Sequence, residues 1–310
     1  MSNILAIAQK ELKSYFVSPI AYALLAIYAL ISGWFSLIAI ANFIEMSQQG
    51  GGPADLNGYV IAPVVSNAAV LSLFLIPMIT MRLFAEEKRT GTIELLVTSP
   101  VTDMEIVLGK WLGAMGMYAA ILLVKMLCLS FVFMFGNPDW RPLATAYLGM
   151  FLQGGALLSI GMFISNTTKN QIVAGATTFG MCLLFWTFDW ATTFKADGWA
   201  KVLAYLSLTA HFSAYARGVI DTKDTIYFLS VIVLGIFLTA RSLESLRWRA
   251  QTIWHPGKPN SRPSPASTWR SSSPRSLLLM FSRTATTSLG TPPSTSAIRS
   301  PTRRKKWLRD

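Results

Sequence analysis

The chain has 310 residues, of which 52% are hydrophobic and only 14% are charged, and its mean hydropathy is +0.45. Soluble globular domains carry about 25% charged residues, so this composition excludes an ordinary soluble domain and indicates a membrane protein. Most of the formal net charge of +12 belongs to the last 60 residues, which hold 11 Lys and Arg against one acid, so it marks no nucleic-acid surface on the main body.

The first predicted element is an amphipathic helix over residues 3–16. Its apolar residues recur at helical spacing, whereas Lys10, Glu11 and Lys13 fall largely on the opposite face. Such a helix is expected to lie in the membrane interface. The alternative is a plain extension of the first membrane span.

Six apolar runs follow, each close to the roughly 20 residues that a transmembrane helix needs. Ser18 and Pro19 are expected at the N-cap and first position of the first span, and Pro77 is expected to kink the second. The sequence therefore predicts an all-α integral membrane protein. The expected spans are residues 20–41, 60–81, 106–135, 143–165, 172–192 and 226–246.

The distribution of Lys and Arg predicts the orientation of these spans. With the N-terminus inside, the inner segments of residues 1–250 hold ten basic residues and the outer segments hold five. Because basic residues concentrate on the cytoplasmic side, we expect both ends of the helical body there, in a bacterial inner membrane.

The inner segment between the second and third spans carries a series of turn signals. We expect Glu86 and Glu87 to end one helix beside Arg89. Gly91 then allows a turn that a side chain would obstruct.

A short amphipathic helix is expected next, over residues 93–97. Thr92 is positioned to cap it, Glu94 lies in its first turn, and Pro100 stops it because the residue before a proline avoids helical geometry. A short helix that projects from a membrane domain is a handle that a cytoplasmic partner could push. The alternative is a solvated loop with ordinary caps.

The third span opens with a capping box, in which Thr102 and Glu105 are expected to bond reciprocally. Gly109 and Lys110 mark the approach to the membrane. The Lys110 side chain is expected to extend its ammonium group towards the interface.

The outer segment before the last span is expected to form one or two short helices at the outer surface. Gly218, which follows Arg217, is expected to end one helix, and Asp221 is expected to begin the next. His211 lacks the partners that a metal site would require, so a structural role is expected for it.

Two ionisable residues lie in apolar runs, Lys125 in the third and Asp189 near the outer end of the fifth. Intramembrane charges are candidates for function by default. Both spans run from inside to outside, so the two side chains could pair. The alternative is that Lys125 snorkels and that Asp189 is interfacial.

The inner segment resembles the signature of ABC-2 type permeases in EEKRTGTIELL (86–96), SPV (99–101) and IVLGK (106–110). Further stretches are similar to the gliding-motility-associated and nitrous-oxide-cluster-like permeases of that superfamily. These are KELKSYF (10–16), SPIAY (18–22), HF (211–212) and ARGVID (216–221). The resemblance covers about residues 1–250.

This resemblance implies a permease with six spans, an interfacial N-terminal helix and a coupling helix that docks on a separate ATPase subunit. Two permease halves, identical or different, pair with two ATPases, and a membrane-anchored accessory protein is a further expected partner. ATP and Mg bind the ATPase, and no cofactor or metal binds this chain. The residues implied to couple to the ATPase are Glu86, Glu87, Arg89, Gly91, Thr92, Glu94, Pro100, Gly109 and Lys110.

The alternative functions are an ion-coupled carrier and an intramembrane enzyme. A carrier would show several buried charges or broken-helix repeats, and an enzyme would show clustered catalytic or metal-binding residues within the spans. The spans offer one Lys and one peripheral Asp. The sequence therefore favours the permease of an exporter or of a mechanical transmission complex.

The tail, residues 251–310, has a different composition, with 12 Ser, 8 Pro, 8 Thr and 8 Arg. It lacks hydrophobic periodicity and is expected to be disordered. One interpretation is a basic arm for lipid headgroups or acidic partners. The abrupt change of composition favours the other, a product of out-of-frame translation.

Overall fold

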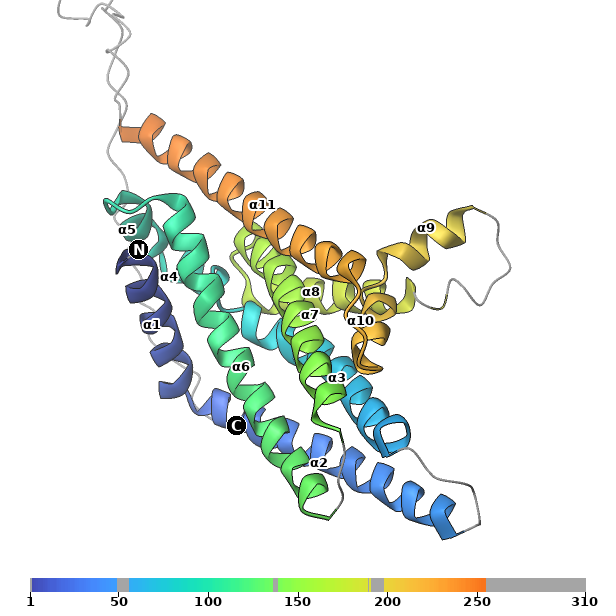
Figure 1. Ribbon diagram of the computed structural model, residues 1–310. Helices are drawn as coiled ribbons and strands as arrows, with labels where there is room; N and C mark the ends of the chain where they lie inside the picture. The colour runs from blue at the N-terminus through green and yellow to red at the C-terminus, as the bar shows by residue number, and fades with distance from the viewer. Residues whose placement is uncertain (1, 49–55, 136–138, 189, 191–197, 255–310) are drawn as a thin grey trace, which may run out of the picture. The chain divides into compact units, whose positions relative to one another are not determined.

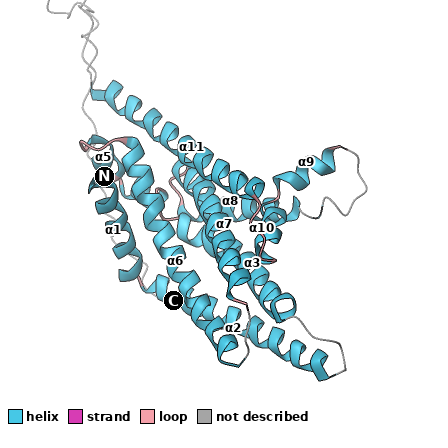
Figure 2. Cartoon of the chain, viewed as in Figure 1, coloured by secondary structure: helices cyan, strands magenta, loops and turns pink. Residues whose placement is uncertain are grey.

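The computed structural model describes residues 2–48, 56–135, 139–188, 190 and 198–254. The chain divides into two units, Met1–Thr252 and Ile253–Asp310, and the first holds nearly all described residues. Within the described ranges every regular element is a helix (Figure 2). The helices (Figure 1) are α1 (Ser2–Val17), α2 (Pro19–Gln48), the π-helical turn η1 (Asn57–Ile61), α3 (Ala62–Thr80), α4 (Ala85–Thr90), α5 (Ile93–Thr98), α6 (Asp103–Phe135), α7 (Trp140–Thr167), α8 (Gln171–Thr187), α9 (Trp199–Leu206), α10 (Leu208–Ala216) and α11 (Thr222–Trp254).

Five stretches of the described helices are long and apolar enough to cross a membrane: α2, the run from η1 to α4, α6, α7 and α11. Helix α8 covers the fifth expected span but has only 17 residues, which is about the lower limit for a span. The prediction of an all-α integral membrane protein is confirmed. Of the six expected spans, five meet the length criterion and α8 falls just short of it.

Helix α3 ends soon after Pro77. A proline has no N–H to donate, so the turn before it loses one backbone hydrogen bond. The hydroxyl of Thr80 donates to the Ile76 carbonyl at 3.0 Å, and the Met81 N–H donates to the Pro77 carbonyl at 3.0 Å. The chain then turns through residues 81–84, and α4 begins at Ala85.

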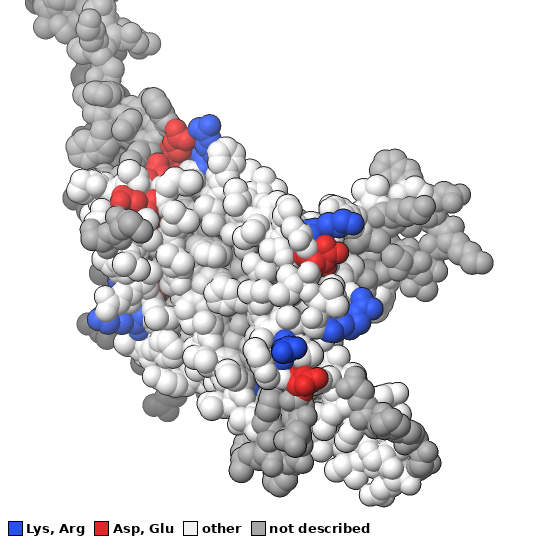
Figure 3. Space-filling view, viewed as in Figure 1, with Lys and Arg blue, Asp and Glu red and all other residues white. Residues whose placement is uncertain are grey.

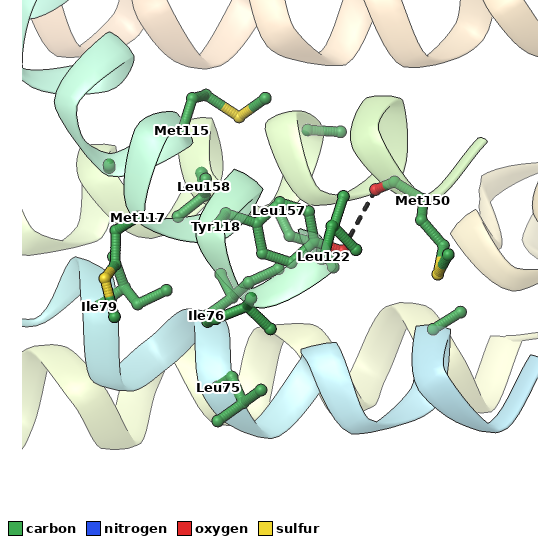
Figure 4. Packing of buried hydrophobic residues seen from close by; sticks show 14 of the residues in the cluster. Leu75, Ile76, Ile79, Met115, Met117, Tyr118, Leu122, Met150, Leu157 and Leu158 are labelled. Carbon is green, nitrogen blue, oxygen red and sulfur yellow. Dashed lines mark hydrogen bonds between the residues drawn. The ribbon is translucent and has the colours of Figure 1, made fainter. Parts of the chain in front are cut away.

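Buried apolar side chains of α3, α6 and α7 pack together in the core (Figure 4). The Tyr118 hydroxyl, buried in this core, donates to the Met150 carbonyl at 3.2 Å. A buried hydroxyl needs such a partner, because leaving it unbonded is costly in an apolar environment. The helices around this core expose many large apolar side chains, α2 and α11 above all, as expected of surfaces that face lipid.

Helix α1 lies along the first half of α6 (Figure 1). A Cβ atom at Gly113 would stand 2.6 Å from Glu11 Cβ, and one at Gly109 would stand 2.7 Å from Ile7 Cβ. Only glycine allows two helices to approach so closely. The predicted apolar face of α1 therefore packs against protein, while Lys10 and Lys13 are exposed.

The visible surface separates charged from uncharged regions. Figure 3 shows Lys, Arg, Asp and Glu gathered towards the margins of this face, with a broad uncharged area between them. A band of this kind matches the hydrocarbon region of a bilayer, which disfavours charge. This surface and the apolar helices together describe a multi-pass membrane protein.

Candidate functional site

We use 'inner segment' for residues 82–112. The ammonium group of Lys110, near its end, makes contacts with three oxygen atoms and an aromatic ring. Its Nζ donates to Glu11 Oε1 at 2.6 Å, to Glu87 Oε1 at 2.8 Å and to the Leu83 carbonyl at 2.9 Å. Lys110 is 1% exposed, and its Nζ also lies 5.2 Å from the centre of the Phe84 ring. All three ammonium donors are used, so the group is fixed in place.

Two expectations about this region are wrong. Lys110 does not extend towards the interface, because two carboxylates and a carbonyl hold it inside the protein. Glu11 does not belong to the exposed face of α1, because it turns inward to pair with Lys110. We call Glu11, Glu87 and Lys110 the anchor cluster; it joins α1, α4 and α6.

Helix α4 begins where a side chain from α7 binds its first amides. The N–H groups of Phe84 and Ala85 both donate to Ser165 Oγ at 3.2 Å. Unbonded N–H groups at a helix start need such acceptors. The sequence had predicted that Glu86 and Glu87 end a helix. In the structure they lie in the first turn of a new helix, α4.

Further polar contacts hold α4 to the surrounding helices. Arg82 pairs with Glu86 at 3.0 Å and donates to Ser18 Oγ, at the start of α2, at 3.3 Å. Lys88 donates from Nζ to the Asn166 carbonyl at the end of α7. Asn166 in turn donates from Nδ2 to the Thr239 carbonyl of α11 at 3.4 Å. The segment 82–88 is thus bound to several helices at once.

Gly91 ends α4 in a left-handed conformation, with φ of 76°. The predicted turn is confirmed, but its reason differs, since a Cβ atom there would meet nothing within 4 Å. The requirement is for the backbone conformation, which L-residues rarely adopt, and not for space.

Helix α5 follows directly, with Glu94 in its first turn as expected. The predicted cap by Thr92 is wrong, because its side chain makes no capping bond. Its hydroxyl lies instead 3.0 Å from that of Thr90. The predicted stop is confirmed: Ser99, before Pro100, is extended, with ψ of 153°.

The start of α6 has the predicted capping box. The Thr102 N–H donates to Glu105 Oε2 at 3.0 Å, and the Glu105 N–H donates to Thr102 Oγ1 at 3.3 Å. The start of α6 is therefore defined by a strong local signal.

The structure divides the expected coupling residues into two groups. One group lies in or beside the bound region, and the other lies on the projecting segment, by which we mean residues 89–100. The first group is Glu86, Glu87, Gly109 and Lys110, and the second, whose members are all exposed, is Arg89, Gly91, Thr92, Glu94 and Pro100.

Tyr15 is a further contact between α1 and the core. Its hydroxyl donates to the Ile79 carbonyl near the end of α3 at 2.9 Å. Burial, reinforced by the nearby Glu11 carboxylate, raises the pKa of this phenol above its ordinary value. Tyr15 therefore remains a neutral hydrogen-bond donor.

Lys125 is 1% exposed, and its Nζ donates to Ser36 Oγ of α2 at 3.2 Å. Its expected partner, Asp189, lies outside the described residues. Among the residues that the structure describes, no carboxylate lies within ion-pair distance of Lys125. The pairing of these two residues stays a prediction.

The outer segment forms two short helices, α9 and α10, as expected. Gly218 has φ of 86° after the end of α10, and Asp221 Oδ1 accepts from the Lys223 N–H at 3.0 Å at the start of α11. Arg217 is exposed and donates to the Ser213 carbonyl at 3.2 Å. His211 lies 2.6 Å from Asp224 Oδ1 and is stacked on Tyr227.

The sequence did not reveal three contacts: Glu11 with Lys110, Ser165 with the start of α4, and Asp224 with His211. A signal for the first existed, since Gly109 and Gly113 lie four residues apart and mark a close helix contact. No local signal marks Ser165, which acts on amides about 80 positions earlier in the chain.

In the described ranges, no group of three or more His, Cys, Asp or Glu side chains could hold a metal ion. The full sequence has no Gly-Lys-Ser or Gly-Lys-Thr phosphate-binding motif. What the inner segment presents is a short helix, α5, which packs Ile93 and Leu96 against the core and exposes Glu94 and Leu95.

A comparison with known families gave one informative result. The family model described as ABC-2 family transporter protein matches residues 41–240, which is more than half of the chain. No curated protein matches the sequence.

Proposed function

We propose that this chain is driven through its projecting segment by a separate ATPase subunit. The chain belongs to the ABC-2 family of transporter proteins and is a permease component of an ABC transporter. The observation that carries the proposal is the contrast within the inner segment. The exposed residues of the projecting segment, among them Arg89 and Glu94, offer their side chains to a partner, while the residues just before them are bound to Ser18, to α6 and to α7.

Force applied to α5 would reach the membrane helices by a short route. Helix α5 joins α4 through the turn at Gly91, and α4 is held by the anchor cluster and by Ser165. Displacement of α4 would therefore carry α1, α6 and α7 with it. In the proposed cycle, ATP-driven closure of the ATPases pushes this segment and rocks two permease halves against each other.

The remaining assignments complete this proposal. ATP and Mg bind the ATPase, and this chain contributes no cofactor. The segment 82–112 faces the cytoplasm together with the N-terminus, in a bacterial inner membrane. The second permease half is a copy of this chain or a relative, and a membrane-anchored accessory protein is a further partner. The similarity to gliding-motility-associated permeases supports an exporter or a mechanical transmission complex.

Affinity purification of the full-length chain from its native membranes tests the proposal. We expect wild type to retain a subunit that carries ATPase phosphate-binding motifs, and Glu94→Lys and Gly91→Pro to lose most of it at unchanged yield of the permease. The matched control is Glu45→Lys, an exposed glutamate at the other end of α2, which should retain the ATPase. Wild type that purifies without any ATPase would contradict the proposal.

The assignment of the permease to residues 1–250 has a separate test. We propose that the tail from residue 251 contributes nothing to transport. A chain that ends at residue 250 should insert and retain the ATPase as the full chain does. Loss of the ATPase from a stably inserted shortened chain would show that the tail takes part.

A further inference from the structure

His211, in the outer segment, has both of its ring nitrogens next to oxygen atoms. Nδ1 lies 2.6 Å from Asp224 Oδ1, and Nε2 lies 2.9 Å from the Tyr205 carbonyl oxygen. A backbone carbonyl can only accept, so Nε2 must carry a proton. At 2.6 Å a second proton must lie between Nδ1 and the carboxylate, because two lone pairs at that distance would repel each other.

The helix ends around this pair favour the charged form of both partners. The Tyr205 carbonyl belongs to the last turn of α9, where unbonded carbonyls and the helix dipole attract a cation. Asp224 lies in the first turn of α11, where the dipole favours an anion. The second proton therefore belongs on the ring, as an imidazolium paired with a carboxylate.

Aromatic side chains enclose the ring without sealing it from water. The Tyr227 ring is stacked on His211, with centroids 4.0 Å apart and planes at 23°, and the Tyr205 ring meets it edge-on at 5.1 Å. The side chains of His211 and Asp224 are 9% and 14% exposed, so protons can exchange with the solvent. Tyr227 also donates its hydroxyl to the Leu206 carbonyl at 2.7 Å.

The described titratable groups that face the ring come from two helices. Helix α11 contributes Asp224 and Tyr227, and α9 contributes Tyr205. The nearby charged residues Arg217, Asp221 and Lys223 are exposed. The pair with Asp224 is thus the contact that decides whether the ring keeps its second proton.

We propose that His211 and Asp224 form a proton-binding site that, when occupied, latches α9 and α10 onto the first turns of α11. The site links the three helices directly, because His211 belongs to α10 and bonds to α9 and α11 at the same time. Removal of the proton leaves the Nδ1 lone pair against a carboxylate oxygen. The latch is therefore closed at low pH and opens as the pH rises.

Nuclear magnetic resonance of histidine tests the occupancy. The chain has two histidines, His211 and His255, so His255→Gln leaves a single ring to label with ¹⁵N. We expect both nitrogens of His211 to be protonated at about pH 6, as the two contacts of the ring require. Asp224→Asn, which removes the carboxylate partner, should lower the fraction of doubly protonated rings at that pH.

Asp221→Asn is the matched control for the charge. It makes the same chemical change on an exposed carboxylate three residues away, and asparagine remains a good helix cap. Its His211 titration should match that of wild type. A neutral His211 ring at about pH 6 in wild type, or the same titration in wild type and Asp224→Asn, would overturn the proton site.

The latch itself has a second, mechanical readout. Spin labels on Ser213→Cys in α10 and Ser230→Cys in α11, both exposed, report the distance between these helices once Cys128 and Cys182 are replaced by alanine. We expect a narrow distribution at low pH that broadens as the His211 ring loses its proton, and a broad one at every pH in Asp224→Asn. A distribution that does not change through the titration would overturn the latch.

Discussion

The two halves of the inner segment differ in how they are held. Residues 82–88 are bound to Ser18, to α6 and to α7, with Lys110 fixed by two carboxylates and α4 started by a serine from α7. Residues 89–95 are exposed except for Ile93, and the turn among them requires one left-handed glycine, Gly91. The first half resembles the interior of a protein, and the second resembles a surface that is ready to bind.

The difference separates residues that contribute to the stability of the fold from residues that would bind a partner. A change in the bound half should alter folding, because it leaves buried polar groups without partners. A change in the projecting half should alter partner binding while the membrane domain stays intact. Four substitutions probe this division, in order of decreasing expected effect on stability.

The largest effect is expected from Lys110→Met. This substitution leaves Glu11 and Glu87 as two carboxylates close together without their shared cation, which should cost about 3–5 kcal/mol. We expect loss of folded protein, measured by thermal melting in detergent. Lys10→Met, which removes an exposed lysine from α1, should melt as wild type does. Equal melting of the two variants would contradict the role of the anchor cluster.

A smaller effect is expected from Gly113→Val, which places side-chain atoms where Glu11 already lies. Overpacking of this kind costs about 1–3 kcal/mol and should loosen α1 from α6. Protease sensitivity of α1 and thermal melting report the change. Gly180→Val is the control, because a Cβ atom there meets nothing within 4 Å. If the control were as unstable as Gly113→Val, close approach would not be the cause.

Gly91→Ala should cost less, about 1–2 kcal/mol, because alanine disfavours the left-handed conformation and nothing there obstructs its methyl group. The substitution should make the turn less ordered and weaken ATPase binding. Gly91→Asn, which tolerates φ near 76°, should recover much of both. If Gly91→Asn were as unstable as Gly91→Ala and bound the ATPase as weakly, the left-handed backbone conformation would not be the reason for a glycine at this position.

The smallest effect on stability is expected from Glu94→Lys, within about 0.5 kcal/mol of wild type, because its side chain is exposed. Its effect on ATPase binding should nevertheless be the clearest of the four. Parallel measurements of melting and ATPase retention on the same preparation separate the two. A destabilised Glu94→Lys chain would remove the distinction between the two halves of the segment.

The sequence allowed most of the fold and part of this site to be predicted. The spans, the capping box at Thr102 and the turn at Gly91 follow from local patterns, although α2 and α11 continue seven and eight residues past the predicted ends of their spans. These features depend on neighbours in the chain, so a single sequence contains their causes.

The contacts of Lys110 and the start of α4 could not be predicted in the same way. Both depend on residues that are distant in sequence, Glu11 for the first and Ser165 for the second. An exposed position for Lys110 was the reasonable expectation, because isolated lysines at a membrane boundary extend to water. Only the close approach of α1 to α6 brings a carboxylate to it.

The bond between Ser165 and the start of α4 has a consequence for biosynthesis. Residues 84 and 85 leave the ribosome about 80 residues before the hydroxyl that binds their amides. Lys110 likewise follows both of its carboxylate partners in order of synthesis. The inner segment therefore cannot reach its final structure when it first emerges, and it must wait until the fourth span, α7, has entered the membrane. Its completion marks the point at which this part of the chain is ready for a partner.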